Sequence, residues 1–142
     1  MTRTALLALA AMLAAGTAYA ADTKIATVKM TEAQEVPPHD GKGTGTAVFT
    51  IDPAAKTVAW KVTWENLSSN AVAAHIHGPA APGVNAGVAV NLAPNGMKMP
   101  LEGSASLTDA QLADLMAGKD YINVHTDTNK GGEIRGQITP GM

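Results

Sequence analysis

A strict alternation of apolar and polar residues in the middle of the chain constrains the fold most strongly. The apolar series is Val58, Trp60, Val62 and Trp64, and it alternates with Ala59, Lys61, Thr63 and Glu65. Because successive side chains of a β-strand point to opposite sides, this period of two predicts a strand with one face in a core. We expect both tryptophans in that core, and a surface aromatic platform is the alternative for the pair.

Short segments of the same kind recur along the chain and predict about eight antiparallel strands. They span residues 25–31, 47–51, 58–65, 72–77, 87–92, 101–107, 121–126 and 133–138. The turns between them draw on 14 glycines and 8 prolines, a composition that suits an all-β protein of short strands. One helix interrupts this pattern, because Thr108 and Gln111 form a capping box. We expect about three helical turns that end near Gly118.

The first twenty residues have the composition of an export signal. Arg3 is followed by an apolar run and by the small-residue triplet Ala18-Tyr19-Ala20, after which cleavage is expected. The run is too short for a permanent membrane anchor. Residues 21–142 then form a single domain, periplasmic or secreted and free of the membrane. The absence of cysteine excludes thiolate chemistry, and a net charge of −2 gives no reason to expect nucleic acid as a partner.

Three of the four histidines fall on two predicted strands in a pattern that favours metal binding. His75 and His77 flank the apolar Ile76, so their side chains lie together on the outer face of one strand. His125 has the same outward position on a later strand. Imidazole is the commonest transition-metal ligand, so we predict a site formed by these three side chains, with His39 as a fourth ligand from a loop. Copper is favoured, with zinc as the alternative.

Several neighbouring residues are candidates to support this site. The hairpin of the last two strands places Asn123, Glu133 and Arg135 beside the third histidine, where Glu133 would orient an imidazole. We also expect a surface ion pair between Glu133 and Arg135. Met97 and Met99 lie in a loop and offer thioether ligands suited to copper(I).

A structural reading of the histidines stays open beside the metal reading. His75 and His77 would then hydrogen-bond backbone carbonyls at a barrel rim and brace the loop that begins Gly78-Pro79, and His125 would brace the turn at residues 129–132. His39 would be a solvated loop residue. On this reading the chain is a non-enzymatic module for a protein or matrix partner.

Four motifs occur in one order along the chain: Glu32–Pro38, Ala74–Ala80, Gly118–Thr126 and Gly131–Ile138. Together they resemble the CHRD domain, a module found in chordin and in many exported microbial proteins. The resemblance runs from about residue 25 to residue 139. It implies a Greek-key, immunoglobulin-like antiparallel β-sandwich or barrel, and for the bacterial members it implies no well-defined function.

A second resemblance concerns arrangement alone. Copper-zinc superoxide dismutase is a Greek-key sandwich that binds copper through a His-x-His strand and a later histidine, with an arginine that guides the substrate anion. His75, His77, His125 and Arg135 are similar to that plan in order and type. The chain lacks a bridging histidine, a zinc loop and a disulfide, so a dismutase-like enzyme ranks below an exported protein for metal holding or oxidative-stress protection. A homodimer or a protein partner is left open.

Overall fold

A computed structural model describes residues 22–141, so the predicted signal peptide lies outside the described residues. Eight strands make up nearly half of the described chain. They are β1 (Lys24–Thr31), β2 (Thr44–Asp52), β3 (Thr57–Glu65), β4 (Ala71–His77), β5 (Val88–Asn91), β6 (Leu101–Ser106), β7 (Asp120–Thr126) and β8 (Ile134–Ile138). A short 3₁₀ helix, η1 (Glu32–Gln34), follows β1.

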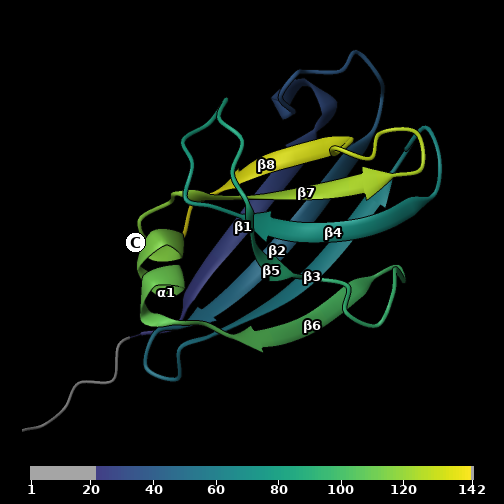
Figure 1. Cartoon of the computed structure of the whole chain (residues 1–142). Coiled ribbons are helices and arrows are strands. Elements are labelled where there is room, and N and C mark those ends of the chain that lie inside the picture. Colours follow the sequence, from purple (N-terminus) through teal and green to yellow (C-terminus); the bar gives the residue numbers. More distant parts are fainter. Residues whose placement is uncertain (1–21, 142) are drawn as a thin grey trace, which may run out of the picture.

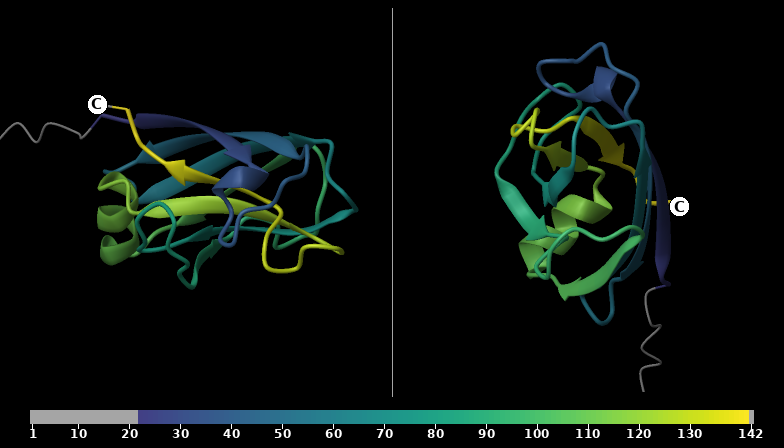
Figure 2. Two further views of the ribbon diagram at one scale, coloured as in Figure 1. Left: turned by 90° about the horizontal axis from the view of Figure 1, so that it is seen from above. Right: turned by 90° about the vertical axis from the view of Figure 1, so that its right-hand side faces the viewer.

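The strands form one antiparallel sheet that curls into a nearly closed barrel (Figures 1 and 2). Their order is β5-β4-β7-β8-β1-β2-β3-β6, so β5 and β6 are the two edges. In Figure 1, β4, β7 and β8 form the near wall and β1, β2 and β3 lie behind them. The predicted all-β class with eight strands is confirmed, and the barrel is the form that it takes.

The barrel interior is filled by the inward residues that the period of two predicted. Phe49, Val58 and Val62 are fully buried, and Trp60 is only 5% exposed. Trp64 departs from the prediction, because it is half-buried at the end of β3 and packs against the core from its margin. Burial of large apolar side chains is the main stabilising contribution to such a core.

The predicted helix is present as α1 (Asp109–Met116) and covers one end of the barrel (Figure 1). Thr108 Oγ1 accepts from the Gln111 N–H at 3.2 Å, and Gln111 Oε1 accepts from the Thr108 N–H at 2.9 Å, which completes the capping box. The chain leaves the helix through Gly118, whose φ is +71°. Eight residues make only about two turns, one fewer than predicted. Within the described residues, no helix has the length and apolar character needed to cross a membrane.

Two loops cover part of the outer side of the near wall. The loop between β4 and β5 (residues 78–87) rises beside β7 and β8 in Figure 1 and is held by side chains of both strands. The segment at residues 32–43 lies on β8 and the turn before it, through η1 and His39. Outward-facing residues that the alternation predicts at the surface, such as His77 and Arg135, are therefore buried under these loops.

Candidate metal centre

The three predicted histidines come together on the outer side of the near wall. Strands β4 and β7 are antiparallel neighbours, with His75 opposite Asn123 and His77 opposite Tyr121. One ring nitrogen of His75, one of His77 and one of His125 lie within 4.8 Å of one another. Within the described part of the chain, no carboxylate joins this group. The side-chain grouping predicted from the strand pattern is thus present, and it offers neutral nitrogen ligands.

Two of the three imidazoles are oriented by backbone carbonyls. His77 Nδ1 lies 3.0 Å from the carbonyl oxygen of Ala86, and His125 Nδ1 lies 2.8 Å from that of Lys130. A carbonyl oxygen can only accept, so each Nδ1 carries the hydrogen and each Nε2 keeps a lone pair. His77 Nε2 is buried without a hydrogen-bond partner. A donated Nδ1–H that fixes the tautomer is the usual support of a metal-binding histidine.

His75 completes the group through a direct contact with His125. Its Nδ1 lies 3.0 Å from His125 Nε2, and because that nitrogen holds a lone pair, His75 Nδ1 is the donor. A metal ion between the two rings would replace this proton. Metal–nitrogen bonds of about 2.0–2.1 Å keep two ligand nitrogens no more than about 4.2 Å apart. The three nitrogens lie up to 4.8 Å apart, so the widest pair needs to close by at least about 0.6 Å.

Burial keeps two of the imidazoles in the neutral form that binds metal. Burial, together with smaller contributions from the neighbouring His125 and His77 rings, lowers the pKa of His75 to about 4. Burial also lowers the pKa of His125, against the opposing effect of its hydrogen bond to Lys130. Both rings are therefore uncharged at neutral pH, which is the state required for metal coordination.

Arg135 is enclosed, which does not suit the anion-guiding role that the resemblance to superoxide dismutase implies. Its side chain is only 2% exposed. The guanidinium donates to Asn85 Oδ1 at 3.0 Å and to the Val84 carbonyl oxygen at 2.7 Å, both in the β4–β5 loop. Its central carbon lies 3.4 Å from the ring centre of Tyr121, where a cation–π contact holds it. The alternation correctly predicted that Arg135 points to the outer face of its strand, but it did not predict that the β4–β5 loop covers that side chain.

Glu133 is also buried, and the predicted surface ion pair with Arg135 is wrong. Its carboxylate accepts hydrogen bonds from Ser68 N–H at 2.6 Å, Ser68 Oγ at 2.7 Å, Thr126 Oγ1 at 2.6 Å and Asn129 Nδ2 at 3.0 Å. Burial acts to raise the pKa of Glu133, but the hydrogen bonds from Thr126, Ser68 and Asn129 outweigh it and lower the pKa. Both oxygens are thus engaged away from the histidines, so Glu133 fixes the turn before β8 instead of orienting an imidazole.

That turn receives three side-chain donors on consecutive carbonyls. His125 donates to Lys130, Asn123 Nδ2 to Gly131 at 3.4 Å, and His39 Nε2 lies 3.1 Å from the Gly132 carbonyl oxygen. His39 therefore braces the turn and lies outside the three-histidine group. Asn123 is buried and acts on the same turn, so its support of His125 is indirect. The predicted bracing by His125 is present together with its place in the cluster.

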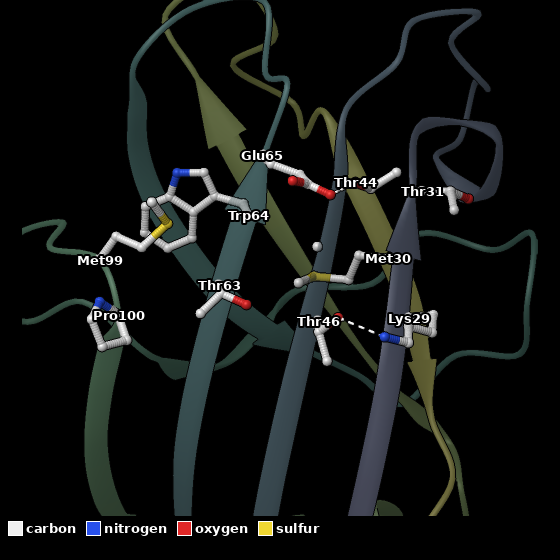
Figure 3. Close-up of a pocket in the computed structure, with 11 residues that line it drawn as sticks. Lys29, Met30, Thr31, Thr44, Thr46, Thr63, Trp64, Glu65, Met99 and Pro100 are labelled. Atoms are coloured by element: carbon white, nitrogen blue, oxygen red, sulfur yellow. Dashed lines mark hydrogen bonds between the residues drawn. The ribbon is translucent and has the colours of Figure 1, made fainter.

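The two methionines lie elsewhere. Met97 packs against the core from a half-buried position. Met99 is 55% exposed and borders a hollow of about 630 Å³ over β1–β3, beside Trp64 and Pro100 (Figure 3). None of the three clustered histidines lines that hollow. The structure therefore associates Met99 with Trp64, and a soft-ligand role for either methionine stays a prediction without support from their positions.

Tyr121 contacts the cluster but is not among the site residues predicted from the sequence. Its ring stacks on His77 at 5.0 Å between centroids, with the planes only 6° apart. Its hydroxyl oxygen accepts from the Ala86 N–H at 3.1 Å, in the residue whose carbonyl binds His77. The sequence does indicate its position, because a residue four positions before His125 on the same strand lies on the same face as that histidine.

Comparison with known proteins identifies the family. No curated protein and no solved structure shows significant similarity to the chain. The model of one family, described as the CHRD domain, matches residues 26–138, which is nearly all of the described chain. That match includes η1, every described strand except the first residues of β1, and the three clustered histidines. The chain belongs to the CHRD domain family.

Proposed function

We propose that this CHRD-domain protein binds a transition metal ion, with copper favoured, through His75, His77 and His125. The observation that carries the proposal is the orientation of His77 and His125. Each donates Nδ1–H to a backbone carbonyl and leaves Nε2 toward the shared space. Three imidazoles without thiolate suit copper(II) or zinc, and the order of divalent affinities favours copper.

The proposed role is metal holding or oxidative-stress protection outside the cytoplasm. The export signal expected in residues 1–20 supports a periplasmic or secreted location. A site with two of its three ligands oriented in advance loses less conformational freedom when the ion binds, which suits retention of a scarce metal. A dismutase activity has less support, because the arginine that would guide an anion is buried under the β4–β5 loop.

Calorimetric titration of the purified protein with copper(II) and with zinc tests this proposal. We expect one ion per chain for the unmodified protein and a loss of affinity of at least about 100-fold for His75→Ala/His77→Ala. His39→Ala is the matched control, since that ring lies outside the cluster, and it should bind as the unmodified protein does. Equal weak binding by all three proteins would contradict the proposal.

A non-enzymatic binding module is the second candidate. It is favoured by the same hydrogen bonds, because His77 and His125 each fix a covering loop or turn without any ion. On that account the histidines maintain the shape of a surface for a protein or matrix partner. The double variant would then lose thermal stability without any change in metal affinity, and this outcome separates the two candidates.

A further inference from the structure

We propose that Tyr121 and Arg135 are positioning residues that hold His77 in its metal-binding orientation. This inference rests on the proposed metal site and deepens it, because it assigns the support of His77 to an aromatic ring and a guanidinium. Strand β7 lies between β4 and β8, so His77 and Arg135 approach Tyr121 from opposite neighbouring strands. The three side chains form a stack of imidazole, phenol and guanidinium.

Tyr121 constrains His77 in two independent ways. The stacked rings fix the plane of the imidazole, since a parallel offset contact is lost when either ring rotates. The Tyr121 hydroxyl also accepts from the Ala86 N–H, and the carbonyl of the same residue accepts from His77 Nδ1. The phenol therefore holds both the ring and the backbone group that sets its tautomer.

Arg135 holds the same assembly from the other side. Its guanidinium lies over the Tyr121 ring and donates to Val84 and Asn85, the two residues that precede Ala86. Asn85 Nδ2 in turn donates to the Val36 carbonyl at 3.0 Å, which ties the β4–β5 loop to the segment after η1. The loop is thus fixed at three successive residues next to the histidine. Removing the guanidinium would leave the carbonyl of Val84 and the side-chain oxygen of Asn85 without their donor. Arg135 therefore stabilises this part of the loop.

Two substitutions separate the contributions of the ring and the hydroxyl. Tyr121→Phe keeps the stack and removes only the contact with Ala86, and Tyr121→Leu removes both. We expect copper affinity to fall about 10-fold in the first and about 100-fold in the second, with Arg135→Gln between them. Gln137→Ala is the matched control. Gln137 lies on the same face of β8 and holds the same loop at Ala80, yet it makes no hydrogen bond to His77 or Ala86.

The metal-free protein gives a readout that does not depend on affinity. Imidazole nitrogen NMR should report the Nδ1–H form of His77 in the unmodified protein and in Gln137→Ala, and a mixture of tautomers in Tyr121→Leu. Circular dichroism confirms that each variant is folded. An unmodified protein that binds no metal would contradict the proposed function alone. A folded Tyr121→Leu protein with unchanged copper affinity and an unchanged tautomer would overturn the positioning role, as would an equal loss in Gln137→Ala.

Discussion

The histidine cluster and the hollow over β1–β3 differ in how their polar groups are held. In the hollow, Lys29 Nζ donates to Thr46 Oγ1 at 2.9 Å and Glu65 accepts from Thr44 at 3.4 Å, both at the exposed surface (Figure 3). In the cluster, His77 is tied to a backbone carbonyl of the β4–β5 loop and His125 to one of the turn before β8. The hollow thus has side chains free to rearrange in water, and the cluster has two of its three ligands oriented before any ion arrives.

Removing a buried carboxylate near the cluster should have the largest effect. Glu133→Ala leaves the buried hydroxyl of Thr126, the half-buried amide of Asn129 and the N–H of Ser68 without their acceptor, so we expect a loss of about 3–5 kcal/mol in the free energy of unfolding. Glu65→Ala in the hollow is the control and should change that free energy by less than about 0.5 kcal/mol. Urea denaturation measures both, and equal losses would remove the distinction between the two regions.

Single histidine substitutions should have the next largest effect, on metal affinity. His125→Ala removes one of the three ligands and should weaken copper binding by about 100-fold, equivalent to about 2.7 kcal/mol. Trp64→Ala in the hollow should leave the affinity unchanged, because none of the clustered histidines lines that space. Competition with a chelator of known affinity provides the measurement. A larger loss of copper affinity for Trp64→Ala than for His125→Ala would place the ion in the hollow and contradict the proposed site.

How much of this could be predicted from the sequence depends on which contacts are local. The alternation of apolar and polar residues predicted the strands. It also predicted that His75, His77 and His125 point outward, because the direction of a side chain depends only on its position within its own strand. The capping box likewise gave α1. The covering loop was not predictable, since contacts such as Arg135 with Val84 join residues far apart in sequence. For the same reason Glu133, one residue before β8, was wrongly expected at the surface.

Acid should destabilise the metal-free protein through the clustered histidines. The folded pKa of His75, about 4, lies below that of an unfolded histidine near 6.5, and the pKa of His125 is also lowered. The unfolded chain therefore binds more protons, so stability present at pH 7 is lost as pH falls from about 6.5 toward 4. Because these rings are partly exposed, we expect a loss of about 1–2 kcal/mol.

The effect is measured as a difference from His75→Asn/His125→Asn, by urea denaturation between pH 7.5 and pH 4. The comparison with a variant is needed because burial, followed by the nearby Asp114, raises the pKa of Asp120 to about 6. Asp120 acts in the opposite direction: its contribution to the free energy of unfolding is lost as pH rises from about 4 to 6. Identical pH profiles for the two proteins would show that the imidazoles are not held neutral by the fold.

The smallest effect is expected at His39. It contacts the Gly132 carbonyl from outside the cluster, so His39→Ala should lower the free energy of unfolding by about 0.5–1.5 kcal/mol and change copper affinity by less than 3-fold. Thermal melting with and without copper measures both quantities. A drop in affinity comparable with that of His125→Ala would make it a fourth ligand, as the sequence had suggested.

Anomalous diffraction from a crystal of the copper-loaded protein tests the central claim most directly. We predict one ion at about 2.0–2.1 Å from one nitrogen each of His75, His77 and His125. His77 and His125 would bind through Nε2 while their Nδ1 atoms still contact the carbonyls of Ala86 and Lys130. An ion at any other position, or one bound through Nδ1 of His77 or His125 with those carbonyl contacts broken, would contradict the account.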